Sequence, residues 1–190
     1  MTPGLIVMLV IIVVLLVYGM VIYNGLVNLK HGVAKAWSNI DVLLKQRHDE
    51  LPKLVEVCKQ YMGFEKDTLQ RVTAARSAVF AARERADVAQ VGAAETVLRA
   101  GLGNLFALAE SYPDLKADQQ FKQLRDRISQ LENAIADRRE LYNDSVNINN
   151  VRVEQFPDVV VARLFAFGPR PLLEFSAEEL KDLDLRQLFN

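Results

Sequence analysis

Four side chains capable of acid–base chemistry lie within ten residues of this chain: Asp41, Arg47, His48 and Glu50. In a helix, Asp41 and His48 share one face because they are seven residues apart, and Arg47 and Glu50 share the neighbouring face. They interrupt two otherwise apolar stripes, and we interpret them as a structural polar layer that fixes the register of packed helices. The alternative is a proton-sensing or ligand site on His48, since burial and a carboxylate shift histidine pKa values.

A later stretch supplies candidates to complete this layer across a helical bundle: Arg139, Tyr142 and Asn143, with Arg138 beside them. The layer offers His48 and one or two carboxylates, which are too few ligands for zinc. We therefore expect no metal site and no bound cofactor.

Other patterns that suggest enzymes are weak in this sequence. The glycines of Gly101-Leu102-Gly103 follow no strand and open no helix, so they favour a close helix crossing over a phosphate loop. Cys58 is the only cysteine, and its surroundings favour a core position over a nucleophile. With no nucleophile–base pair, we expect no enzymatic activity. A formal net charge of −1 provides no broad basic face for nucleic acid.

The element that must position everything else is an uncharged run from Gly4 to Tyr23. As a helix it is about 30 Å long, which matches the hydrocarbon core of a bilayer. A cleaved signal peptide is the alternative, but the run lacks a basic start and a small-residue cleavage site. We therefore expect residues 1–4 to be a short N-terminal tail and residues 5–24 to be a transmembrane anchor in contact with lipid.

The charges that flank the anchor predict its orientation. No Lys or Arg precedes the run, whereas Lys30, Lys35, Lys45 and Arg47 follow it. Under the positive-inside bias, this asymmetry predicts a single-pass protein with its N-terminus outside and its soluble domain in the cytoplasm.

Helical periodicity dominates from Asn24 to Phe156. The pattern predicts helices over about 34–62, 64–85 and 87–110, a turn at 111–114, and a fourth helix of 35–40 residues that starts near Ala117. Gly25 and Gly32 do not force a break after the anchor, and Pro52 predicts a kink rather than an end. We predict an all-α protein whose transmembrane helix continues into an elongated antiparallel four-helix bundle over residues 25–157.

The remaining residues, 158–190, are expected to form an irregular apolar tail. The nine-residue run 159–167 is too short to span a bilayer, and a capping-box pattern at 176–179 predicts a short terminal helix. Such a tail docks on its own bundle or presents apolar surface to a second copy, a partner or the membrane. Its candidate interaction residues are Phe165, Phe167, Leu172, Leu173 and Phe175. We expect a homo-oligomer, with other membrane proteins as further candidate partners.

Several segments together resemble the LemA family of bacterial membrane proteins. The opening segments are 23–27, 36–42, 44–45, 47–48, 51–52 and 54–55, with Val33; the later ones are 107–108, 112–117, 142–143 and 155–157, with Glu110, Phe121, Leu124, Arg139, Val146 and Asn149. The chain departs from the family pattern at Val146–Asn150 and after Pro157, so the family's properties carry over least to its end.

The resemblance implies one N-terminal transmembrane helix, a cytoplasmic helical bundle, location in the bacterial plasma (inner) membrane and no established enzymatic activity. With the sequence features above, it leads us to expect a membrane-anchored scaffold or adaptor. The alternative is a membrane-surface sensor that responds to pH or lipid through the His48 layer and the C-terminal tail.

Overall fold

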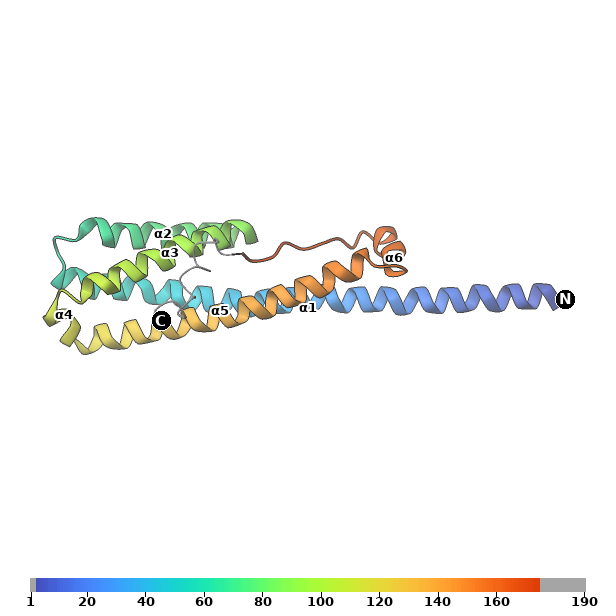
Figure 1. Ribbon diagram of the computed structural model, residues 1–190, viewed down its shortest axis with the longest axis horizontal. Coiled ribbons are helices and arrows are strands. Elements are labelled where there is room, and N and C mark those ends of the chain that lie inside the picture. Colours follow the sequence, from blue (N-terminus) through green and yellow to red (C-terminus); the bar gives the residue numbers. More distant parts are fainter. Residues whose placement is uncertain (1–2, 175–190) are drawn as a thin grey trace, which may run out of the picture. The chain divides into compact units, whose positions relative to one another are not determined.

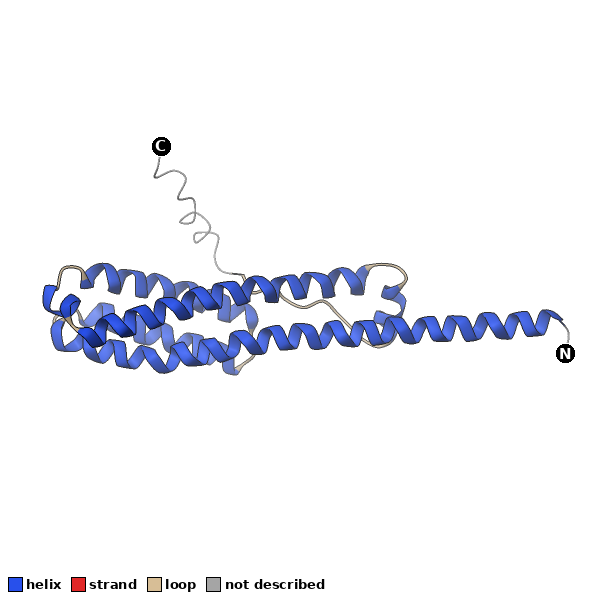
Figure 2. Cartoon of the chain, turned by 90° about the horizontal axis from the view of Figure 1, so that it is seen from below, coloured by secondary structure: helices blue, strands red, loops and turns tan. Residues whose placement is uncertain are grey.

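The computed structural model describes residues 3–174, and these residues are helical with no strand among them (Figure 2). The helices, coloured along the chain in Figure 1, are α1 (Pro3–Tyr61), α2 (Lys66–Glu84), α3 (Val88–Ala109), α4 (Pro113–Ala117), α5 (Gln119–Glu154) and α6 (Asp158–Leu164). The predicted all-α class is confirmed for this part of the chain. Phe175 and the expected terminal helix from Ser176 lie outside the described residues.

Helix α1 is continuous from the apolar run into the rest of the protein. Neither Gly25, Gly32 nor Pro52 ends it. Each large side chain between Leu5 and Val21 is at least 43% exposed. By length and composition, α1 is the one helix among the described residues that qualifies as a membrane span.

Local side-chain chemistry explains where the other helices begin. Asp87 caps α3 by accepting a hydrogen bond from the Gln90 amide at 3.0 Å, and Asp118 accepts one from the Phe121 amide at 2.8 Å at the start of α5. Where the sequence predicted only a turn, Pro113 occupies the first turn of the short helix α4. A proline fits there because the first helical amides need no intrahelical acceptor.

The chain divides into two compact units, and each draws on part of α1 and part of α5. Among the described residues, the core unit comprises Asn39–Glu140 and the segment 172–174, which starts at Leu172. In it, α2 and α3 pack side by side. Its interior is a large apolar cluster that includes Leu54, Leu102 and Ile128, each fully buried.

The anchor unit comprises the chain up to Ser38 together with Leu141–Pro171. Its small apolar cluster joins Ile22 and Leu26 of α1 to Val153 of α5 and Ala162 of α6. After α6 the chain runs back along α5. It is held there by hydrogen bonds from the side-chain amide of Asn149 to the Gly168 carbonyl at 3.3 Å and from the side-chain amide of Asn150 to the Arg170 carbonyl at 2.9 Å.

Candidate functional site

The Arg47 guanidinium is a fully buried charge of the core unit. Arg47 donates a hydrogen bond to Glu95 of α3, and both side chains are 1% exposed. The Glu132 carboxylate of α5 lies 3.9 Å from the other terminal nitrogen of Arg47. One guanidinium on α1 therefore faces carboxylates from two other helices, and its burial is compensated by opposite charge.

Some polar atoms of this cluster have no protein hydrogen-bond partner. The buried atoms without such a partner include Arg47 Nε, Arg47 Nη1, Glu95 Oε2 and His48 Nδ1. A cavity of about 10 Å³ adjoins Arg47 and His48, and its other lining residues are Leu44, Leu51, Arg76, Val79 and Leu98. This volume corresponds to about one water molecule, so the cluster has room for a bridging water but not for an organic substrate.

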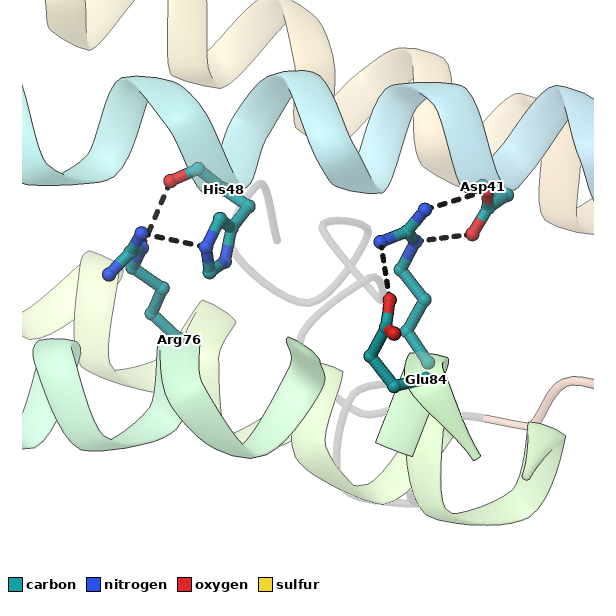
Figure 3. Close-up of polar contacts among 5 residues, drawn as sticks. Asp41, His48, Arg76 and Glu84 are labelled. Carbon is teal, nitrogen blue, oxygen red and sulfur yellow. Dashed lines mark hydrogen bonds and ion pairs between the residues drawn. The ribbon is translucent and has the colours of Figure 1, made fainter. Parts of the chain in front are cut away.

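His48 contacts an arginine of the neighbouring helix. Arg76 donates from Nε to the His48 carbonyl at 2.9 Å, and Arg76 Nη2 lies 2.7 Å from His48 Nε2 (Figure 3). Because arginine only donates, Nε2 accepts this bond and the imidazole is neutral with its proton on Nδ1. The Phe80 ring stacks on the imidazole with a centroid separation of 4.7 Å.

The environment of His48 disfavours its charged form. Burial lowers the pKa of His48 below its ordinary value of 6.5, and the positive charge of Arg76 lowers it further, while Asp49 acts in the opposite direction. His48 is therefore neutral near pH 7. The charged side chain in contact with the His48 ring is a cation, whereas the pH-sensing hypothesis invoked a carboxylate.

Asp41 forms a separate pair with Arg83 of α2. Arg83 donates to both carboxylate oxygens of Asp41, through Nε to Oδ1 and through Nη2 to Oδ2 at 3.0 Å, and it also reaches Glu84 at 3.3 Å (Figure 3). The hydrogen bond to Asp41 raises the pKa of Arg83. Although Asp41 and His48 share a face of α1, they engage different arginines.

The remaining residues of the expected polar layer are Glu50, Arg139, Tyr142 and Asn143. Glu50 pairs with Lys53 at 2.9 Å on the exposed surface of α1. Arg139 is half-buried in the core unit, whereas Tyr142 and Asn143 belong to the anchor unit. There the Tyr142 hydroxyl donates to the Pro171 carbonyl at 3.0 Å, and its ring packs against Trp37.

The residues of the expected interaction tail differ in exposure. Leu173 is buried and Leu172 is half-buried, so this part of the tail packs on its own chain. Phe165 is 54% exposed, and Phe167 is half-buried. Both phenylalanines lie against Tyr23 of α1, with ring centroids 4.8 Å and 5.7 Å from it.

The sequence interpretation missed the partners of the polar side chains: Arg76, Arg83, Glu95 and Glu132. A signal existed for Glu95, which occupies an inward position of α3 between the buried Val91 and Leu98. A charged residue on such a stripe requires an opposite charge on a facing helix. Arg76 and Arg83 instead follow inward-facing alanines, which gives no comparable signal.

The described residues provide little catalytic or metal-binding chemistry. Within 3–174, no group of three or more His, Cys, Asp and Glu side chains could hold a metal ion. Cys58 is fully buried, and burial raises the pKa of its thiol to about 11. The thiol is therefore protonated and unreactive at neutral pH.

Comparison with known proteins identifies one family. The LemA family model matches residues 36–185, which is most of the chain. A search of curated proteins finds no significant match.

Proposed function

This chain belongs to the LemA family, and we propose that it is a non-enzymatic scaffold or adaptor anchored by residues 5–24 in the bacterial plasma membrane. One observation carries this proposal. Helix α1 contains the exposed apolar run and, without a linker, supplies Ile22 and Leu26 to one apolar cluster and Leu54 to another. An anchor that is also a core helix holds the folded part at the membrane surface.

The same proposal takes the core unit to be an antiparallel four-helix bundle of α1, α2, α3 and α5. Support comes from the short connections between consecutive helices and from the cluster to which all four contribute. The buried pairs of Arg47 with Glu95 and Asp41 with Arg83 join different helices. Their role in this account is to fix which helix faces meet, rather than to act on a substrate.

The flanking charges support an orientation with the N-terminus outside and the folded units in the cytoplasm. A protease added to the outside of intact cells should leave these units uncleaved. The same protease added after the membrane is permeabilised should cleave them. Cleavage in intact cells would contradict the orientation without contradicting the anchor.

Identifying the neighbours of the protein in its membrane would distinguish a self-associating scaffold from an adaptor. Photo-crosslinking groups placed at the exposed Val97 and at the exposed Leu141, followed by mass spectrometry, would identify these neighbours. Crosslinks to a second copy support a homo-oligomeric scaffold, and crosslinks to other membrane proteins support an adaptor. If both sites crosslink only to lipid or to their own chain, the scaffold proposal fails.

One observation favours a second candidate, a membrane-surface sensor of pH. If His48 is protonated, Nε2 can no longer accept from Arg76, and two cations then face each other across α1 and α2. Because the pKa of His48 lies below 6.5, this change occurs in acid rather than at neutrality. Assembly that changes below pH 6.5 in the native protein but not in His48→Asn would favour the sensor; a scaffold assembles independently of pH there.

A further inference from the structure

An apolar face remains exposed where α5 ends and α6 begins. Phe156 is 81% exposed, Leu164 is 75% exposed and Val160 is 59% exposed. Val160 and Leu164 are four residues apart, so they project from the same side of α6. We call Phe156, Val160 and Leu164, together with the exposed Phe165, the α6 face. Four large apolar side chains exposed within ten residues are costly to leave in water.

Contacts within the anchor unit fix the level of the α6 face along α1. Near Leu141, the ring of Tyr142 lies 5.5 Å from that of Trp37. Farther along α5, a terminal nitrogen of Arg152 lies 4.0 Å from the Cβ position at Gly25. Finally, Phe165 and Phe167 contact Tyr23. Within the anchor unit, α5 therefore runs antiparallel to α1, and α6 lies beside α1 (Figure 1).

This level coincides with the end of the apolar run. Tyr23 is the last residue before the polar Asn24, and the first charged residue, Lys30, is seven residues or about 10 Å beyond Tyr23 along the helix. If residues 5–24 span the bilayer, the α6 face lies at the boundary between acyl chains and headgroups. Aromatic and aliphatic side chains are stabilised at this boundary.

The charges around α6 fit the same environment. Its acidic residue, Asp158, is 3% exposed and accepts a hydrogen bond from Arg152, so it does not present a free carboxylate to lipid. Arg163 is exposed on the same helix. A long arginine side chain beside apolar residues can keep its guanidinium at the level of lipid phosphates.

From this placement, we propose that the α6 face is a second membrane contact, which inserts into the interfacial layer of the bilayer beside the anchor. This proposal rests on the anchoring role of residues 5–24. The bilayer, rather than a second copy, is the occupant because contacts with Tyr23 set the face level with the end of the span. The protein then has one helix across the membrane and the α6 face in the interfacial layer of the membrane. These two contacts together restrict tilting of the anchor unit.

The test measures the depth of single tryptophans in the full-length protein. Trp37 is the only native tryptophan, so Trp37→Phe provides a background protein without tryptophan fluorescence. Phe156→Trp and Leu164→Trp are introduced separately, and each variant is inserted into phosphatidylcholine–phosphatidylglycerol vesicles that contain brominated lipids. We expect the brominated lipid to quench the fluorescence of both tryptophans, and we expect their emission maxima to shift to shorter wavelength.

Two matched positions control the measurement. Leu141→Trp replaces an exposed side chain of α5 that lies 13 residues, or about 20 Å, before the end of that helix at Glu154, and it should lose no emission to lipid. Tyr18→Trp lies within the apolar run and should be strongly quenched. Every tryptophan is introduced at an exposed position, and helical circular dichroism checks that the Trp37→Phe background and each variant fold; Val160→Trp replaces a variant at 156 or 164 that does not.

Each outcome has a distinct meaning. Quenching at positions 156 and 164 but not at 141 supports the α6 face as a membrane contact. Quenching at 18 alone overturns this proposal and leaves the anchor intact, whereas no quenching at 18 contradicts the anchor itself. If tryptophan at 156 or 164 is shielded only at high protein-to-lipid ratio, a second copy covers the face and the membrane contact is overturned.

Discussion

The two units of this protein are built from parts of the same two long helices, yet they treat their apolar residues differently. The core unit buries a continuous cluster that includes Leu51, Val72, Leu102 and Phe121, and it even encloses a charged pair. The anchor unit buries only a few apolar residues and leaves the apolar run and the α6 face exposed.

The difference shows that exposure of apolar side chains must be interpreted from their position along the chain. A single exposed leucine needs no explanation, but several exposed large apolar side chains beside the end of an apolar run do. In our account, protein covers the clustered apolar residues of the core unit, whereas lipid covers the apolar run and the α6 face of the anchor unit. The stability of the core unit should therefore depend on its own contacts; substitutions at Arg47, Gly92 and His48 test this, and a substitution at Tyr142 tests the anchor unit.

The largest effect is expected from Arg47→Leu in the core unit. The substitution leaves Glu95 buried without its cation, which should lower the free energy of unfolding by about 3–5 kcal/mol. Urea denaturation followed by circular dichroism, in detergent and again in vesicles, measures the loss. We expect the same loss in both, because no lipid contributes to this pair.

The exposed pair of Lys53 with Glu50 on the same helix provides the control. Lys53→Leu should change the free energy of unfolding by no more than about 1 kcal/mol. The double variant Arg47→Leu/Glu95→Leu should recover most of the loss, because the uncompensated buried carboxylate is removed. Equal effects of Arg47→Leu and Lys53→Leu would show that the buried pair does not organise the core unit.

A smaller effect is expected where the segment from Leu172 packs on α3. A Cβ added at Gly92 would lie 2.1 Å from the backbone oxygen of Glu174, so Gly92→Ala must displace this segment. We expect a loss of about 1–3 kcal/mol, as for other overpacked sites. Thermal or urea unfolding measures it, and faster proteolysis near Leu173 would show the displacement.

Gly103 is the matched position for Gly92, on the same helix but with nothing near its Cβ position. Gly103→Ala should stabilise the protein by up to about 1 kcal/mol, since alanine favours helix more than glycine does. If the two substitutions have the same effect, the packing of Leu173 and Glu174 against α3 is incorrect.

In the anchor unit, Tyr142→Phe tests the hydrogen bond that holds the chain after α6. The substitution removes the donor to the Pro171 carbonyl and should cost about 0.5–1.5 kcal/mol. Tyr18→Phe, in the exposed apolar run, should cost nothing measurable. Hydrogen exchange at the end of α5 provides the readout, and unchanged protection in Tyr142→Phe would contradict the contact.

The smallest effect concerns His48 and depends on pH. Because its pKa is lower in the folded protein than the ordinary 6.5, the unfolded chain binds the proton more readily. Stability should therefore decrease as pH falls below 6.5, until the folded pKa is passed. Urea midpoints between pH 7.5 and 5 measure this slope, and His48→Asn should reduce it. A stability that increases on acidification in this window would reverse the assignment of a neutral His48.

Periodicity allowed the helices to be predicted because their apolar residues recur along uninterrupted stretches. Continuity of α1 past Gly25 and Pro52 followed from the small cost of glycine and from the absence of other breaks. The short helix α6 was not predicted, since Val159, Val160 and Val161 are β-branched and lower the local helix propensity. Its packing against α1, with Ala162 beside Ile22 and Leu26, is a tertiary effect that periodicity does not report.

Only the α1 residues of the polar site were predictable, and their partners on the other helices were not. Asp41, Arg47 and His48 stand out because they interrupt apolar stripes of a single helix. Which arginine or carboxylate each one meets depends on how the helices align, and a sequence without tertiary contacts does not determine this alignment. For that reason Glu50 was grouped with a buried layer, although it pairs with Lys53 at the surface.

Alkaline carbonate extraction of membranes that contain either the full-length protein or a chain starting at Asn28 tests the central claim most directly. Residues 5–24 are the anchor in our account, so full-length protein should remain in the membrane pellet. The shortened chain should appear in the supernatant, because carbonate releases proteins held only at the membrane surface, including through the α6 face. Release of the full-length protein by carbonate would contradict the membrane-anchored scaffold.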